Sequence, residues 1–100
     1  MLDLDFLADR QAKNLSQDPE DWRTAVWSEG FQKLSQNMSD GEVETLITFS
    51  PSVKRLQDIV SFLEHRSKEL GTPPFTVLAD EARLAGLSAA EWILRFNPAE

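Results

Sequence analysis

Helix-start signals recur along this sequence, and apolar residues at steps of three and four follow them. In Asp18–Asp21, the first aspartate suits the N-cap, Pro19 suits the first helical position, and the next two acids suit the positive end of the helix dipole. Ser39–Glu42 and Ser88–Glu91 have the serine-to-glutamate spacing of a capping box. The pattern predicts an all-α fold.

The same spacing predicts a single compact domain of five to six helices with short connectors. Gly71 and Gly86 are expected to end two of them, because glycine readily adopts the left-handed backbone of a helix end. Ser50 and Pro51 repeat the cap-then-proline signal and are expected to start another helix. Residues 45–49 are rich in β-prone side chains, so a strand is the alternative there. The expected helices span about residues 4–15, 19–36, 40–49, 51–70, 75–85 and 89–96.

Charge is unevenly distributed along the chain. The full sequence has 10 Lys and Arg against 17 Asp and Glu, a formal net charge of −7. Ten of the acids and four of the bases lie in residues 1–50, so residues 1–49 form an acidic helical half and residues 50–97 are nearly balanced. A negative field repels nucleic-acid phosphate and suits a basic protein partner, including a nucleic-acid-binding one. The alternative is that the charge only keeps a small domain soluble and monomeric.

Several chemistries lack the residues that they need. The chain has no cysteine, which excludes disulfides, thiol nucleophiles and cysteine metal sites. Its one histidine, His65, lies opposite the apolar face of its predicted helix. The sequence has no glycine-rich phosphate loop and no EF-hand spacing of acids. We therefore expect no enzyme activity, no cofactor and no metal, with paired carboxylates in a cleft as the alternative.

Tryptophan bears on binding because it is common at interface hot spots. Trp22 and Trp27 lie about 140° apart on one predicted helix, since each residue turns a helix by about 100°. We expect Trp27 and Trp92 in the core, whereas Trp22 is open to either role. Acids near Trp22 and in the following segment complete the candidate partner contacts, which are Trp22, Asp18, Asp21, Asp40, Glu42 and Glu44.

The segment Pro51–Phe96 resembles a helix-turn-helix unit of three helices. Gly71–Pro74 joins the first two helices, and the run from Ala82 to Ser88 has the small residue, glycine, leucine and capping serine of the sharp turn. This order is similar to the amino-terminal domain of LexA-type repressors. The resemblance implies a DNA-binding transcriptional regulator, whose phosphate contacts would be Lys54, Arg55, Arg83 and Arg95.

The third helix departs from that family at the positions that would face the bases. They hold Ala89, Ala90 and Glu91, where base reading needs arginine, lysine, asparagine or glutamine. We therefore take a small acidic, non-catalytic protein-binding regulator or adaptor as the leading hypothesis, and the DNA-binding regulator as the alternative. Asp18–Trp22 and Phe62–Pro74 are also similar to the DsrC/TusE sulfur-relay family, but its carboxy-terminal cysteines are absent here, so this likeness implies a fold only.

The sequence also bears on location and assembly. No apolar run approaches the roughly 20 residues of a membrane span, and residues 1–5 are acidic where a signal peptide is basic. We expect a cytoplasmic protein with no membrane partner. Homodimerisation through an exposed aromatic face is an open alternative.

Overall fold

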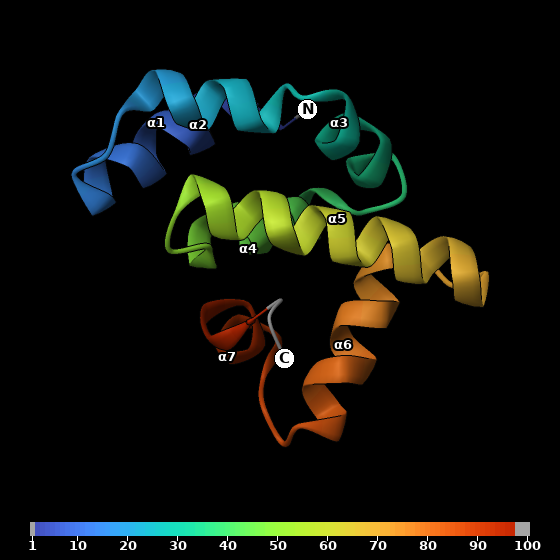
Figure 1. The fold of residues 1–100 in the computed structure, drawn as a ribbon. Helices are drawn as coiled ribbons and strands as arrows, with labels where there is room; N and C mark the ends of the chain where they lie inside the picture. The colour runs from blue at the N-terminus through green and yellow to red at the C-terminus, as the bar shows by residue number, and fades with distance from the viewer. Residues whose placement is uncertain (1, 98–100) are drawn as a thin grey trace.

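Seven α-helices are formed by residues 2–97, the part of the chain that the computed structural model describes (Figure 1). The all-α prediction is confirmed, and the helices of this range outnumber the predicted five to six. No strand occurs in the described range, so the strand alternative for residues 45–49 is wrong. The helices are α1 (Leu4–Leu15), α2 (Pro19–Val26), α3 (Glu29–Ser35), α4 (Asp40–Phe49), α5 (Val53–Leu70), α6 (Pro74–Leu84) and α7 (Ala89–Arg95).

The additional helix arises because the helix predicted over residues 19–36 breaks in two. Trp27 is the C-cap of α2, and Ser28 is the N-cap of α3 with an extended backbone. The Ser28 hydroxyl donates to the Ala25 carbonyl at 2.8 Å and accepts from the Phe31 backbone N–H at 3.3 Å. One serine therefore satisfies the end of α2 and the start of α3, and the two segments need not share one apolar face.

The strongest local signals of the sequence are confirmed. Asp18 accepts a backbone N–H of α2 at 2.9 Å, and Ser39 and Ser88 each form a complete capping box. Gly71 is the C-cap of α5, and Gly86 directly follows Ala85, the C-cap of α6. Their φ angles are 65° and 72°. These angles lie in the left-handed region, which glycine enters without a steric penalty.

α5 begins two residues later than the cap-then-proline signal predicts. Its N-cap is Ser52, whose hydroxyl accepts from the Arg55 backbone N–H at 3.1 Å. Ser50 is instead fully buried at the end of α4, where its hydroxyl donates to the Leu46 carbonyl at 2.7 Å. The Ser50 carbonyl accepts from the Gln11 side chain at 2.8 Å. The expected cap is therefore a buried polar link between α1 and α4.

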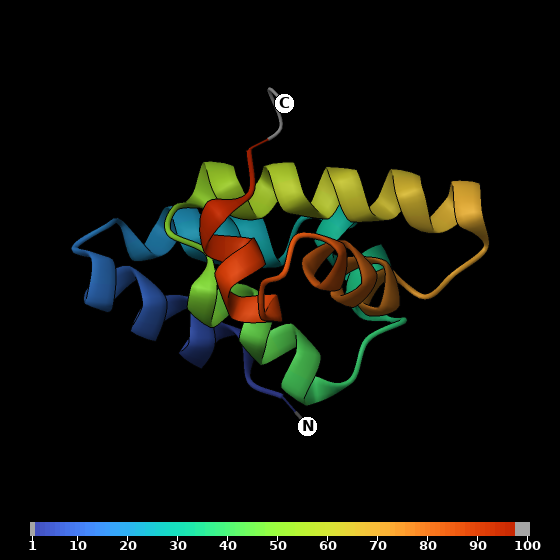
Figure 2. The ribbon, with the colours of Figure 1, turned by 90° about the horizontal axis from the view of Figure 1, so that it is seen from below.

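α5 runs through the middle of the molecule (Figures 1 and 2). In Figure 1, α1, α2 and α3 lie on one side of it, and α6 and α7 lie on the other. α1 packs against α2 and α4, and α7 packs against α4 and α6. The apolar face predicted for α5 is confirmed at Leu56, Ile59, Val60 and Leu63, which are buried. The same face was expected to include Val53 and Leu70, but Val53 is only partly buried and Leu70, at the end of the helix, is 53% exposed. This arrangement leaves the α1–α2 side and the α6–α7 side as separate surfaces.

Candidate protein-binding surfaces

Two contacts join α1 and α2 side by side. The indole N–H of Trp27 donates to the Asp5 carboxylate at 2.7 Å. Arg23 donates to both carboxylate oxygens of Asp9, at 2.8 and 3.0 Å. Residues 5 and 9, like residues 23 and 27, are about one helical turn apart, so the contacts are neighbours on two antiparallel helices. We call Asp5, Asp9, Arg23 and Trp27 the tryptophan seam.

Trp27 is the exposed tryptophan, with 55% of its surface accessible. The core position expected for Trp27 is wrong, because the break after α2 places it at a C-cap instead of on a buried helical face. The core position of Trp92 is confirmed. Trp22 is fully buried, and its indole N–H donates to the Gln17 side chain at 2.9 Å. Trp22 therefore offers no surface to a partner, and Trp27 takes its place among the candidate contacts.

Hydrogen bonds hold the charges of the seam in place. Asp9 raises the pKa of Arg23 above its ordinary value, chiefly through the hydrogen bond and then through its negative charge. Asp5 contacts Trp27 through one carboxylate oxygen and takes part in no ion pair within residues 2–97. A cation that approaches the seam can therefore meet an aromatic face and a carboxylate together.

The acids predicted to bind a partner fall into two groups, which lie on different helices. Asp18 and Glu42 already accept backbone N–H groups in their helix caps. Glu44 lies 3.7 Å from Arg10. α2 and α4 each pack on α1 but not closely on each other, so no direct packing of the two helices brings these acids together. The group at the start of α2 is Asp18 and Asp21, and the group on α4 is Asp40, Glu42 and Glu44.

The four bases of the DNA-binding alternative lie at three places. Lys54 and Arg83 each lie beside an aspartate of their own helix, at 3.2 and 3.0 Å. Arg55 donates to two carbonyls at the end of α7, of which Leu94 is the nearer at 2.8 Å. Arg95 is exposed near the same end of α7. The structure thus brings Arg55 and Arg95 to one helix end and holds the other two on their own helices, and DNA binding stays a prediction.

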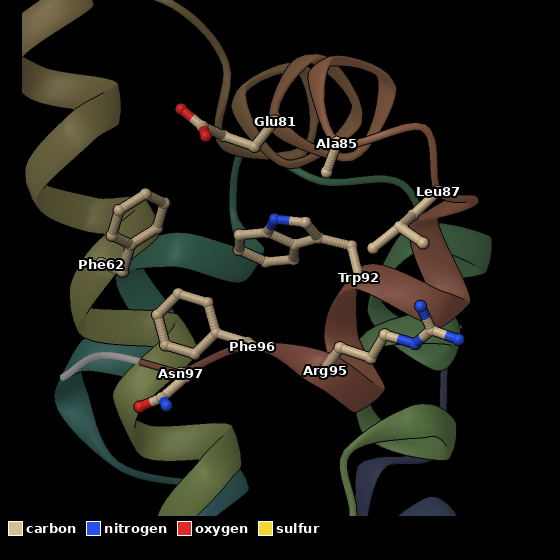
Figure 3. A pocket seen from close by; sticks show the side chains of 8 residues that line it. All are labelled: Phe62, Glu81, Ala85, Leu87, Trp92, Arg95, Phe96 and Asn97. Atoms are coloured by element: carbon tan, nitrogen blue, oxygen red, sulfur yellow. The ribbon is translucent and has the colours of Figure 1, made fainter. Parts of the chain in front are cut away.

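A pocket of about 350 Å³ lies between α5, α6 and α7 (Figure 3). Three tilted aromatic rings line it. The ring centroid of Phe62 lies 5.8 Å from that of Trp92 and 5.3 Å from that of Phe96, and the last two are 4.9 Å apart. Tilted rings at such distances attract one another. We call this pocket the aromatic hollow, and its other lining residues are Glu81, Ala85, Leu87, Arg95 and Asn97.

Two opposite charges border the aromatic hollow. Glu81 of α6 lies 3.9 Å from Arg66, so it already has a cationic neighbour. Arg95 of α7 lies within 4 Å of no carboxylate among the described residues. The carboxyl of Glu91, one turn earlier, has a pKa below its ordinary value, chiefly because the Ser88 backbone N–H donates to it and then because of the Ser88 hydroxyl. Arg95 is therefore the cation at the hollow that remains open to a new contact.

The remaining chemistry-bearing groups lie on the surface. The His65 side chain is 79% exposed, as expected from its place opposite the apolar face of α5, and its Nε2 lies 3.3 Å from Glu69 Oε2. Within residues 2–97, no three His, Cys, Asp or Glu side chains come together in a way that could hold a metal ion. No helix of that range combines the length and the apolar character needed to cross a membrane.

The chain matches no protein-family model, no curated protein and no solved structure. Both surfaces are therefore identified from their own geometry. Sequence reasoning missed both, because Asp5 and Trp27 are 22 residues apart and the hollow draws on three helices. The one advance signal was the equal four-residue spacing of Asp5 to Asp9 and of Arg23 to Trp27, which becomes informative only once α1 and α2 are paired.

Proposed function

We propose that this chain is a small, acidic, non-catalytic adaptor that binds a basic segment of a partner protein at the tryptophan seam. The observation that supports this most directly is the state of Trp27. Its indole is 55% exposed, yet a 2.7 Å hydrogen bond to Asp5 holds it in place. A large aromatic side chain kept in solvent and held in one position is the type of residue that anchors protein interfaces.

The seam complements the chemistry of a lysine or arginine side chain. A cation over an exposed indole face is stabilised by about 0.5–1 kcal/mol. The second carboxylate oxygen of Asp5 can accept a charge-assisted hydrogen bond from the same cation. Because the indole is already held by Asp5, binding has to order only the partner's side chain.

Long-range charge favours the same class of partner. The chain carries a net charge of −7, and residues 1–50 hold ten acids against four bases. Such a field speeds the approach of a basic protein and weakens as salt is added. It disfavours nucleic-acid phosphate, so a basic protein, including one that itself binds nucleic acid, fits the surface better than nucleic acid does.

The non-catalytic part of the proposal is supported by what the reactive side chains do. The only histidine, His65, lies in solvent beside Glu69. Glu42 and Glu91 complete capping boxes, and Asp18 caps α2, so these carboxylates stabilise helices. We include a cytoplasmic location in the proposal, which accords with a chain without disulfides.

Affinity capture with matched variants tests the proposal. The wild-type chain, the double variant Asp5→Asn with Trp27→Ala, and Asp21→Asn would be immobilised and exposed to an extract of the source organism at about 50 mM salt. Asp21→Asn is the control, because it removes an exposed acid of α2 at the end away from Trp27. Circular dichroism would establish that all three are equally folded.

We expect one or more basic proteins to bind the wild type and Asp21→Asn and to be lost from the double variant. They should elute when salt is raised to about 300 mM, because screening weakens exposed ion pairs. Equal recovery by the double variant would contradict a role for the seam. If Asp21→Asn lowers the recovery of these proteins as much as the double variant does, net charge alone attracts them, which would also contradict a role for the seam.

A further inference from the structure

We propose that the aromatic hollow is a second docking site, which takes a peptide segment of a partner protein that carries a bulky apolar side chain beside a carboxylate. The site is distinct from the tryptophan seam, because it lies between α5, α6 and α7, whereas the seam lies on α1 and α2 (Figures 1 and 3). The proposal goes beyond the basic partner proposed above. It gives the adaptor a second binding surface, which prefers a negatively charged segment where the seam prefers a positively charged one.

The hollow suits one bulky apolar side chain. Its volume of about 350 Å³ is near the lower end of the range for ligand pockets, about 300–1,000 Å³. Phe62, Trp92 and Phe96 meet at centroid distances of 4.9 to 5.8 Å, and Phe62 is only partly buried. A further ring or a leucine side chain could pack against these rings without moving them, and aromatic pairs gain more than their buried area accounts for.

The surface around the hollow favours a protein segment over a small molecule. Apolar groups continue past the rim of the hollow. Leu84 of α6 is 81% exposed, and it directly precedes Ala85, which lines the hollow. Leu87 follows in the α6–α7 turn and is half-buried. An apolar surface that extends beyond a pocket marks a protein interaction site.

Arg95 indicates which charge the partner's segment should carry beside its apolar side chain. Among the described residues this guanidinium has no carboxylate within 4 Å, whereas Arg83 and Lys54 lie beside aspartates. The acid on the hollow, Glu81, already lies 3.9 Å from Arg66. The charge that the hollow can still accept is therefore negative. A guanidinium binds a carboxylate through two parallel hydrogen bonds, which also fixes the orientation of the segment.

A titration followed by two-dimensional ¹H–¹⁵N NMR tests this proposal. The probe is the capped peptide Gly-Ser-Phe-Leu-Glu-Ser-Gly, whose single charge keeps repulsion by the acidic chain small. Two matched peptides replace its glutamate with lysine or its Phe-Leu pair with Ala-Ala. The readouts are the Trp92 indole N–H, assigned as the indole signal that is lost in the variant Trp92→Phe, and the backbone amides of residues 81–97. A sample of the free protein at several concentrations completes the set.

We expect the glutamate peptide to shift the Trp92 indole and to bind at least threefold more tightly than the lysine peptide. The Ala-Ala peptide should not shift it. Arg95→Glu should reverse the preference between the glutamate and lysine peptides. Arg83→Glu makes the same charge change on an exposed arginine of α6 that does not line the hollow, and it should leave the preference intact. Asp5→Asn with Trp27→Ala should leave it intact as well, which separates this proposal from the seam.

Four outcomes would overturn the proposal. The first is no shift at millimolar peptide, and the second is equal binding of the glutamate and lysine peptides. The third is free phenylacetate binding as tightly as the peptide, which would make the hollow a small-molecule site. The fourth is a shift of the Trp92 indole with protein concentration alone, which would make a second copy of the chain the occupant.

Discussion

Trp27 and Asp5 are 22 residues apart, and the indole N–H of the first donates to the carboxylate of the second at 2.7 Å in an exposed position. One turn away, Arg23 and Asp9 repeat the contact between the same two helices. The seam thus presents an aromatic face and a carboxylate whose relative positions are set before any partner arrives. A partner that brings a cation gains both contacts with little ordering of this chain.

Truncation of the two tryptophans of the α2 region should lower stability by very different amounts. Trp22→Ala removes a fully buried indole and should lower the free energy of unfolding by about 3–5 kcal/mol. Trp27→Ala removes an exposed one and should lower it by less than about 1 kcal/mol. Urea unfolding of both variants measures this. A comparable loss in the free energy of unfolding in both variants would show that Trp27 stabilises the fold and is not merely a surface side chain.

Arg55 should stabilise the end of α7. Its guanidinium donates to the Leu94 carbonyl at 2.8 Å, a group that the helix itself leaves unpaired. Arg55→Ala should cost about 1 kcal/mol of stability and speed hydrogen exchange in α7. Lys54→Ala is the control, because the Lys54 ammonium pairs with Asp58 of its own helix at 3.2 Å and not with a carbonyl of α7 among the described residues. If exchange in α7 is equally slow in Arg55→Ala, the contact does not hold the helix end.

Glu91 should contribute to the acid sensitivity of the fold. Ser88 holds the pKa of this carboxyl below its ordinary value of 4.5, so the folded state favours the charged form. Its contribution is fully present above that ordinary value and is lost as the pH falls through the lowered folded value. Glu91→Gln keeps a capping-box side chain without a titrating group. Urea midpoints between pH 3 and 7 should therefore fall less steeply below about pH 4.5 in this variant, and parallel curves would refute the assignment.

Gly86 and Gly41 should respond with opposite signs to replacement by alanine. Gly86 has a φ of 72°, which costs an L-residue roughly 1–2 kcal/mol, although nothing lies within 4 Å of an added Cβ. Gly41 lies in α4 at an ordinary φ, also with nothing within 4 Å. Gly86→Ala should lower the thermal midpoint, and Gly41→Ala should raise it slightly. A fall in both midpoints would point to contacts that the structure does not contain.

Local signals accounted for most helix ends. These signals depend on residues within four positions of one another. They are the capping boxes at Ser39 and Ser88, the helix start at Asp18–Pro19, and the glycines that end helices. Such contacts can be recognised without knowing the tertiary fold. The buried face of α5 could also be predicted from the sequence, because a helix of 18 residues repeats its apolar pattern over several turns.

The candidate surfaces could not be predicted from local sequence patterns in the same way. The break at Ser28 depends on one hydroxyl that serves two helix ends, and it carries Trp27 from the expected core to the surface. The pairing of Asp5 with Trp27 depends on the antiparallel packing of α1 and α2, which no local pattern specifies. Ser50 shows the same limit, since tertiary burial turned an expected cap into a link between α1 and α4.

The helix-turn-helix resemblance was also limited to local features. The segment Pro51–Phe96 does contain three helices, α5, α6 and α7, and a left-handed Gly86 before the last of them. Recognition of DNA depends instead on the charge of the exposed face of α7, where Arg95 is the only base. Whether that helix contacts DNA stays a prediction of the resemblance.

The central claim is tested most directly by titrating the labelled chain with a basic peptide of alternating lysine and serine at about 50 mM salt. The account predicts that the Trp27 indole N–H resonance shifts most, that the amide of Asp5 shifts with it, and that both effects fade as salt is raised. A Trp27 resonance that stays in place while the amides of Asp40 and Glu42 shift would contradict it. So would the absence of any shift at this salt concentration.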